Sequence, residues 1–167
     1  MTRTKGGMQR EREYGAIARS IIDSNLYVAL GTSDAEGRPW VSPVYYASAG
    51  YTEFFWASSP EATHSRNIAV RPEISMVIFD SQAAIHTGQA VYMSAVAEEL
   101  FDEALDRGAG IYPGPAERGA RTMTVEQLQP PALHRLYRAI VSQHSILDPE
   151  GHPVHGRKID HRTPVAL

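Results

Sequence analysis

Hydroxyl-bearing and cationic side chains are concentrated in residues 57–68 of this 167-residue sequence. Ser58 ends an apolar stretch, and Thr63, His64 and Arg66 follow shortly after it. Backbone N–H groups at the start of a helix, together with hydroxyls and a cationic side chain, are the usual components of a phosphate site. The same stretch fits an ordinary capped helix with a solvated Arg66 equally well. Two interpretations therefore stay open, a phosphate-binding helix start and a plain helix.

A second unusual segment is residues 38–45, where Pro43 interrupts a sequence that is otherwise typical of a β-strand. Proline lacks the backbone N–H that a strand donates to its neighbour, so Pro43 is expected at a sheet edge or a bulge. A flat ligand that needs hydrogen bonds from backbone groups would suit such an edge. The alternative is an ordinary edge strand without a ligand.

Other kinds of site find less support. The seven histidines include no His-Glu-x-x-His array, and the lack of cysteine removes thiolate nucleophiles and Cys-ligated metals, so we expect no metal site. No Gly-x-Ser-x-Gly elbow is present, although a Ser/His/Asp triad built from distant residues stays open. A formal net charge of −3 gives no basic surface of the kind that binds nucleic acid.

Length and composition predict one soluble globular domain, because 43% of the residues are apolar and 21% are charged. No apolar stretch approaches the roughly 18 residues that a membrane span needs. The polar segment 1–14 lacks the apolar core of a secretory signal. We therefore expect a cytoplasmic protein without a membrane partner.

The elements that would position these residues are predicted from hydrophobic periodicity. Helices are expected over residues 10–24, 59–70 and 101–107, with a capping box at 124–127 and a surface loop at 108–119. Strands are expected from residue 26 to the turn at 34–37 and over 38–47, 52–58, 74–79, 89–100 and 136–147, with 74–79 apolar on both faces. The single domain spans 1–167, with a flexible arm at 1–12 and a basic C-terminal tail at 152–167.

The number and order of these strands predict a mainly β fold with flanking helices. A sheet of six short strands would leave long unpaired edges, so we predict a closed or nearly closed antiparallel barrel. Repeated strand-helix-strand units and a Gly-x-Gly-x-x-Gly sequence are both missing, which argues against a Rossmann domain.

Three pieces of the sequence together resemble the FMN-binding split barrels related to pyridoxamine 5′-phosphate oxidase. They are residues 26–32 with Gly37-Arg38-Pro39, residues 43–46 followed by 55–58, and residues 63–68 followed by 71–75. The resemblance covers about residues 15–100. It implies a six-stranded Greek-key barrel that forms a homodimer and holds the flavin in a groove between the subunits.

The resemblance also implies roles for individual residues. His64 stands where the family usually has a phosphate-binding lysine, and a neutral imidazole would leave most of the phosphate attraction to Arg66 and the helix N-terminus. Implied cofactor contacts are Val41, Ser42, Pro43 and Val44 along the isoalloxazine, Ala57 and Ser58 at the flavin side chain, Thr63, His64 and Arg66 at the phosphate, and Gln89 at the ring.

The C-terminal tail departs from the family, because it keeps arginine and proline but lacks the tryptophan of the substrate-binding signature. True pyridoxamine 5′-phosphate oxidase activity is therefore not expected. The tail is either a frayed terminus or a segment that crosses to the other subunit and places Arg157 or Arg162 over its flavin.

The functional hypothesis is an FMN-dependent oxidoreductase acting on an unidentified small molecule, in which the flavin performs the redox chemistry. One alternative is a protein that binds flavin, a deazaflavin cofactor or haem without turnover. Another is a structural barrel that binds no ligand.

Overall fold

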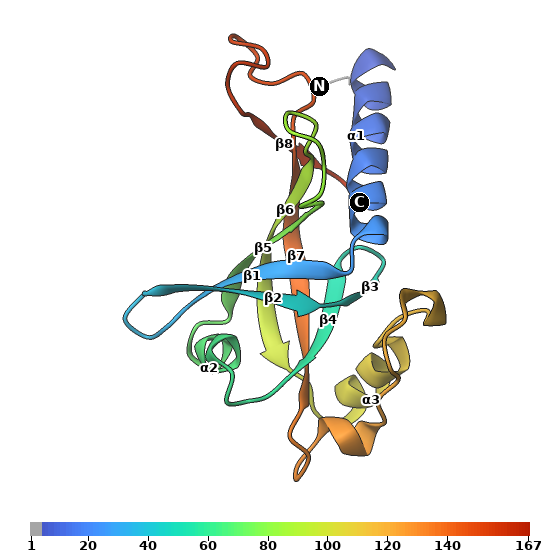
Figure 1. Ribbon diagram of the computed structural model, residues 1–167, viewed down its shortest axis with the longest axis vertical. Helices are drawn as coiled ribbons and strands as arrows, with labels where there is room; N and C mark the ends of the chain where they lie inside the picture. Colours follow the sequence, from blue (N-terminus) through green and yellow to red (C-terminus); the bar gives the residue numbers. More distant parts are fainter. Residues whose placement is uncertain (1–4) are drawn as a thin grey trace.

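The computed structural model describes residues 5–167, and its strands form one curled antiparallel sheet (Figure 1). The sheet has the strand order β2-β1-β5-β6-β7-β4-β3, with β8 paired to β7 beside this path. Its strands are β1 (Tyr27–Ser33), β2 (Pro39–Tyr45), β3 (Ala47–Ala49), β4 (Glu53–Ser58), β5 (Glu73–Phe79), β6 (Ala90–Glu99), β7 (Arg135–Leu147) and β8 (Arg162–Val165). The prediction of a mainly β, six-stranded split barrel is confirmed, because β2 and β3 form one interrupted strand and β8 is a short addition.

Closure of the barrel depends on the single residue between β2 and β3. The two strands end the sheet on opposite sides, yet only Tyr46 separates them in the chain, so the sheet returns on itself. Tyr46 is fully buried, and its hydroxyl donates a hydrogen bond of 2.5 Å to the carbonyl oxygen of Ile22. β3 pairs only with residues 53–55 of β4. Beyond this point β2 and β4 are not paired, which makes the split of the barrel.

The core inside the barrel follows the alternation of the strands. Val28 and Leu30 of β1 are fully buried, and so is Trp56 of β4, whose ring stacks on that of Tyr137 with centroids 5.9 Å apart. Residues 74–79 were predicted to be apolar on both faces, as in a strand that is buried on both sides, but one face of this strand is exposed. Alternate residues of β5 are buried, whereas Phe79 is 49% exposed, because only one face of this strand meets the core.

Helix α1 (Lys5–Ser24) packs along one end of the sheet through Tyr14, Ala18 and Ile22. The helical face predicted for residues 10–24 is present, but the helix begins earlier. The arm predicted over residues 1–12 is therefore corrected from residue 5 onward, and residues 1–4 lie outside the described part of the chain. None of the helices within residues 5–167 is both long and apolar enough to span a membrane.

Two other helices lie toward the opposite end of the barrel (Figure 1). Helix α2 (Thr63–Val70) starts later than the predicted residue 59, because residues 59–62 form a turn in which the Ala62 N–H bonds the Ser59 carbonyl at 3.1 Å. Helix α3 (Asp102–Ile111) extends into the predicted loop of residues 108–119. Gly108 permits this, since a Cβ there would lie 2.8 Å from methyl carbons of both Leu100 and Leu136.

Two short 3₁₀ helices follow α3, η1 (Ala116–Arg118) and η2 (Val125–Leu128). The capping box predicted at 124–127 is present, with the Thr124 N–H bonded to Oε1 of Gln127 at 3.0 Å. These turns pack a second, smaller apolar cluster around Phe55, Leu105 and Leu128 against the outside of the barrel.

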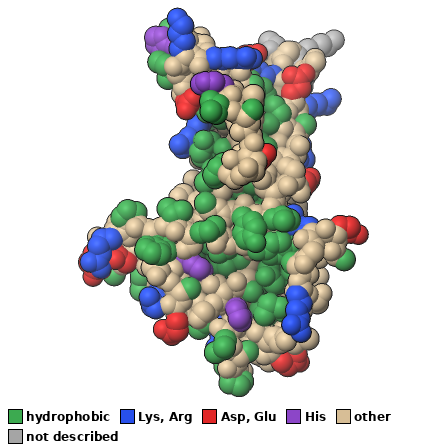
Figure 2. All heavy atoms as spheres, viewed as in Figure 1, with side chains coloured by type: hydrophobic (Ala, Val, Ile, Leu, Met, Phe, Trp, Pro, Cys, Tyr) green, Lys and Arg blue, Asp and Glu red, His purple; other side chains and the backbone are tan. Residues whose placement is uncertain are grey.

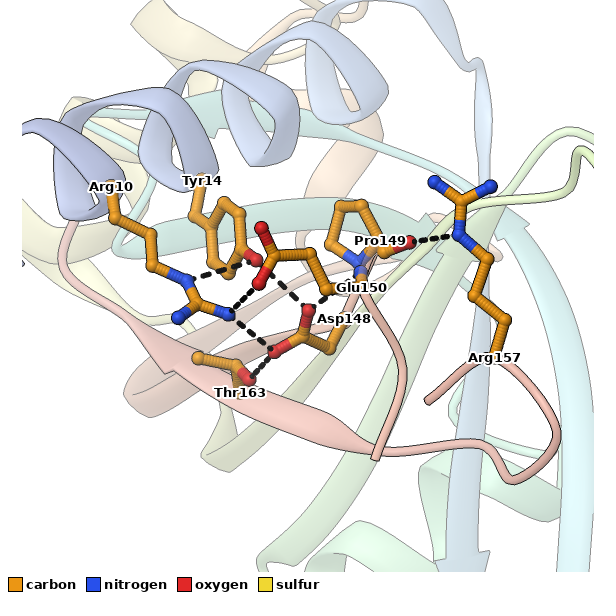
Figure 3. Close-up of polar contacts among 7 residues, drawn as sticks. All are labelled: Arg10, Tyr14, Asp148, Pro149, Glu150, Arg157 and Thr163. Atoms are coloured by element: carbon orange, nitrogen blue, oxygen red, sulfur yellow. Dashed lines mark hydrogen bonds and ion pairs between the residues drawn. The ribbon is translucent and has the colours of Figure 1, made fainter. Parts of the chain in front are cut away.

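The C-terminal tail is not frayed, because it folds back on its own chain. β8 pairs with residues 144–147 of β7. Nearby, the buried Asp148 carboxylate accepts hydrogen bonds from the hydroxyls of Thr163 at 2.6 Å and Tyr14 at 2.9 Å (Figure 3). Arg10 of α1 lies 3.8 Å from the same carboxylate. The contacts join the first helix, the turn after β7 and the last strand.

Candidate functional site

The split between β2 and β4 is bridged by one side chain, the imidazole of His64 from the first turn of α2. Its Nε2 lies 2.8 Å from Oγ of Ser58 at the end of β4, and its Nδ1 lies 3.1 Å from Oγ of Ser42 on β2. The indole N–H of Trp40 donates to the same Ser42 hydroxyl at 2.8 Å. Three residues that the sequence proposed for one site, Ser42, Ser58 and His64, therefore meet in space.

His64 is 8% exposed, and this burial lowers the pKa of its imidazole below the ordinary value of 6.5. The ring is therefore neutral at pH 7, with one nitrogen that donates and one that accepts a hydrogen bond. Both nitrogens are occupied by serine hydroxyls. His64 thus acts as a neutral bridge between two strands, and it contributes no positive charge to the split.

The N-terminus of α2 lies beside this bridge. Thr63 is the first helical residue, and Ala62 before it provides no side-chain cap. Uncapped N–H groups and the helix dipole favour an anion at such a position. Arg66 is directed toward Glu61, since it donates to the Glu61 backbone carbonyl and lies 3.6 Å from the carboxylate. An anion bound here would therefore contact mainly backbone N–H groups and hydroxyls.

Strand β2 has the edge position that Pro43 predicts, because its only extended pairing is with β1. Ser42 and Val44 lie opposite Leu30 and Val28, so they point toward the interior side of the sheet, whereas Val41 and Pro43 point outward. Across the split, Ala57 stands next to Ser58 at the end of β4. The backbone groups of β2 that face away from β1 are the ones available to a flat ligand.

The remaining predicted residues lie elsewhere in the same chain. Gln89 directly precedes β6, whose ten residues separate it by roughly 30 Å from the end of the strand that lies beside α2. It lines a cavity of about 610 Å³ together with Arg157, and its Oε1 is buried without a hydrogen-bond partner in the described part of the chain. One chain therefore does not bring Gln89 and Arg157 to the His64 bridge.

Arg162 occupies a third place. It is the first residue of β8, and its guanidinium carbon lies 4.1 Å from the centre of the Tyr92 ring. Together with Val41 it lines a hollow of about 500 Å³ on the outer face of β1, β5 and β6.

Sequence reasoning missed the contacts that residues 112–118 make near the ends of β2 and β4. The Tyr45 hydroxyl donates to the carbonyl oxygen of Pro113 at 2.6 Å, and the Tyr112 hydroxyl interacts with the backbone of Ala57. Arg118 donates to the carbonyl oxygens of Asn25 and Tyr46 at 2.9 and 3.1 Å. Positions 112–118 lie in a Gly- and Pro-rich stretch with no periodic pattern, so no local signal identified them.

Comparison with known proteins agrees with this fold. Residues 16–143 match the sequence profile of pyridoxamine 5′-phosphate oxidase. The chain belongs to the pyridoxamine 5′-phosphate oxidase family. Among curated proteins none matches the chain.

Several solved structures share the fold at low sequence identity. A haem-binding protein of Mycobacterium smegmatis has a TM-score of 0.63 at 21% identity, covering 87% of this chain and 55% of its own. HutZ, a haem storage protein of Vibrio cholerae, has a TM-score of 0.56 at 22% identity, covering 75% of this chain and 87% of its own. A Bacteroides thetaiotaomicron protein assigned to 5-nitroimidazole antibiotic resistance has a TM-score of 0.63 at 15% identity, covering 78% of this chain and 81% of its own. The chain thus spans about half of the mycobacterial protein.

Proposed function

We propose that this protein is an FMN-dependent oxidoreductase whose flavin lies along the split between β2 and β4, with its phosphate at the N-terminus of α2. One observation carries the proposal. The His64 bridge holds two unpaired strand edges apart next to an uncapped helix start. A flat ring needs backbone hydrogen bonds along an edge, and a phosphate needs N–H groups and hydroxyls at one end.

The residues present fit this cofactor, with one difference from the family resemblance. Ser58 and Thr63 supply hydroxyls and α2 supplies N–H groups, so an anion has partners. The charge of a lysine is missing, because His64 is neutral and buried. We therefore expect phosphate binding to depend mainly on backbone and hydroxyl groups, with Arg66 contributing once it leaves Glu61.

When bound, the flavin would supply the hydride and electron chemistry. The role of the chain would be to orient the ring by the backbone of Val41–Val44, to anchor the phosphate, and to limit access of water from the barrel side. The substrate would be a small molecule reaching the open face of the ring.

A homodimer forms part of this proposal. The outer face of β2 exposes Val41, at 65%, and Pro43 two residues on, and exposed apolar surface of this kind is typical of interfaces. A second copy could also bring its Gln89 and Arg157 to the split, which one chain does not do. Light scattering should give about twice the chain mass of 18.4 kDa.

The first experiment is to purify the protein without added cofactor, denature it and identify the released small molecule by mass spectrometry. FMN supports the proposal, whereas a deazaflavin cofactor or no ligand contradicts it. Bleaching of the flavin absorbance by a reduced nicotinamide would support turnover, and a flavin that is bound but never reduced would indicate a carrier.

A second experiment locates the phosphate. Arg66→Ala should weaken FMN binding by up to about tenfold, because a partly exposed charge contributes at the low end of the usual range, and riboflavin binding should change little. Arg12→Ala on α1 is the matched control, since Arg12 is far along the chain from α2 and carries the same charge. Equal loss of both ligands would contradict the phosphate assignment.

Haem binding without turnover is the second candidate, and it is favoured by the two haem proteins among the structural relatives. Absorbance separates the candidates, since haem gives a strong Soret band near 400 nm and flavin gives a band near 450 nm. If the purified protein carries flavin, titration with hemin should leave its 450 nm band unchanged.

A further inference from the structure

A cavity of about 680 Å³ lies beside the split, between the β1–β2 end of the barrel and the segment that follows α3. Figure 2 shows hydrophobic side chains gathered on this face, where β1 and β2 approach α3. The lining includes apolar side chains that are unusually exposed, among them Leu133 at 80% and Tyr27 at 61%. A cavity of this size is in the range that accommodates a small organic ligand.

Three tyrosines form one wall of this cavity. The rings of Tyr27 and Tyr45 meet edge to face, with centroids 6.3 Å apart at an angle of 82°. Tyr45 and Tyr112 meet in the same way, at 6.1 Å and 73°. Met123 and Leu133 line the cavity as well. Aromatic and thioether groups of this kind pack well against a flat ring.

The charged side chains of the lining are arginines. Arg118 is fixed by two backbone carbonyls and lies over the rings of Tyr46, at 4.9 Å, and Tyr45, at 5.5 Å. Its Nε is buried and lacks a hydrogen-bond partner in the described part of the chain. Arg121 is exposed and makes no hydrogen bond or ion pair within residues 5–167. The lining contains no Asp or Glu, so its field favours an anion.

We propose that this cavity binds a planar aromatic carboxylate, with the ring on the tyrosine wall and the carboxylate between Arg118 and Arg121. Guanidinium groups match carboxylate oxygens in geometry as well as in charge. In this proposal the long connection between α3 and β7, residues 112–134, serves to form one side of the ligand site. The site does not rest on the proposed flavin site, and its test needs no flavin.

The direct test is isothermal titration calorimetry of the full chain with 2-naphthoate and with its neutral counterpart 2-naphthalenemethanol. For a fragment of this size we expect a Kd for naphthoate on the order of 0.1 to 1 mM. The neutral compound should bind about tenfold more weakly, because it loses the charge-assisted contacts. Absence of naphthoate binding in this range, or equal binding of both compounds, would overturn the proposal.

Matched variants place the ligand. Arg121→Gln should weaken naphthoate binding about threefold, because Arg118 keeps its share of the carboxylate contact, and should leave the neutral compound unchanged. Arg12→Gln makes the same charge change on α1, outside the cavity, and should have no effect. Leu133→Ala should weaken the binding of both compounds. Ile85→Ala should weaken the binding of neither, because Ile85 is an equally exposed aliphatic residue that lies outside the cavity. Equal effects of the cavity variants and their controls would overturn the assignment. All four side chains are exposed, so the substitutions should leave the fold intact, and a loss of binding would report on the cavity.

Discussion

Replacing His64 by alanine should lower the free energy of unfolding by about 3 kcal/mol. The substitution removes two hydrogen bonds, to Ser42 and Ser58, each worth about 1 kcal/mol net. It also removes a ring that is 8% exposed, which adds about 1 kcal/mol for lost burial and packing. Because the serine hydroxyls keep Trp40 or solvent as partners, no larger penalty is expected.

The assay is urea unfolding at pH 8, followed by tryptophan fluorescence. With a slope of about 2 kcal/mol per molar urea, the midpoint should fall by about 1.5 M. His134→Ala is the matched control, because His134 is exposed and its side chain makes no hydrogen bond within residues 5–167. Its midpoint should stay within about 0.25 M of the wild type.

The same pair of proteins tests the protonation state. Burial lowers the pKa of His64 in the folded state, so below pH 6.5 the unfolded chain takes up a proton that the folded chain does not. Acid therefore destabilises the wild type through this group, and His64→Ala lacks the effect. His144, whose pKa burial also lowers, is present in both proteins and cancels. The stability gap should narrow between pH 8 and pH 5, and a gap that widens, or one below about 1 kcal/mol at pH 8, would refute the bridge.

The remaining predictions concern parts of the fold away from the His64 bridge. Asp148→Asn should lower the free energy of unfolding by about 1 to 3 kcal/mol, because the Tyr14 and Thr163 hydroxyls lose a charged acceptor, and urea unfolding at pH 7 measures the loss. Burial acts to raise the pKa of Asp148, but the hydrogen bonds from Thr163, the Glu150 N–H and Tyr14 outweigh it, so the pKa is lowered. The stability of the wild type should therefore fall as the carboxylate is protonated below about pH 4. Unchanged stability in that range would contradict this prediction. Truncation after residue 161, which removes β8, should lower the thermal midpoint by several degrees, since β8 pairs with β7; an unchanged midpoint would show the strand to be dispensable. Gly108→Ala should cost about 1 to 3 kcal/mol by crowding two leucines, and a neutral result in the same unfolding assay would mean that α3 shifts freely.

Much of the fold could be predicted because its strands and helices carry local signals. The alternation around Val28 and Leu30, the turn at 34–37 and the capping box at Thr124 all depend on neighbours in the sequence, and the structure contains each of them. Boundaries were less accurate where a distant contact decides them. Helix α3 continues through Gly108 because the missing side chain lets Leu100 and Leu136 approach, which no local pattern reveals.

Ser42, Ser58 and His64 were named from the sequence, but the way in which they contact one another was not predicted. Ser42 and His64 are far apart in the sequence, and they meet only because the barrel returns on itself at Tyr46. Arg118 gave no signal, since its partners are backbone carbonyls of Asn25 and Tyr46. Gln89 was grouped with this site by family resemblance, and the length of β6 separates it from the His64 bridge within one chain.

The His64 bridge has a consequence for how a cofactor would bind. A lysine at this position would be mobile and charged, and its ammonium would become ordered only when a phosphate arrived. The imidazole is instead held from both sides by residues of β2 and β4, so the width of the split is set by the protein itself. A preformed groove saves the ordering cost of binding, while the missing charge removes long-range attraction. We therefore expect flavin association to depend weakly on salt concentration, and a steep loss of association rate between 50 and 500 mM salt would show that a cation, Arg66 above all, governs the encounter.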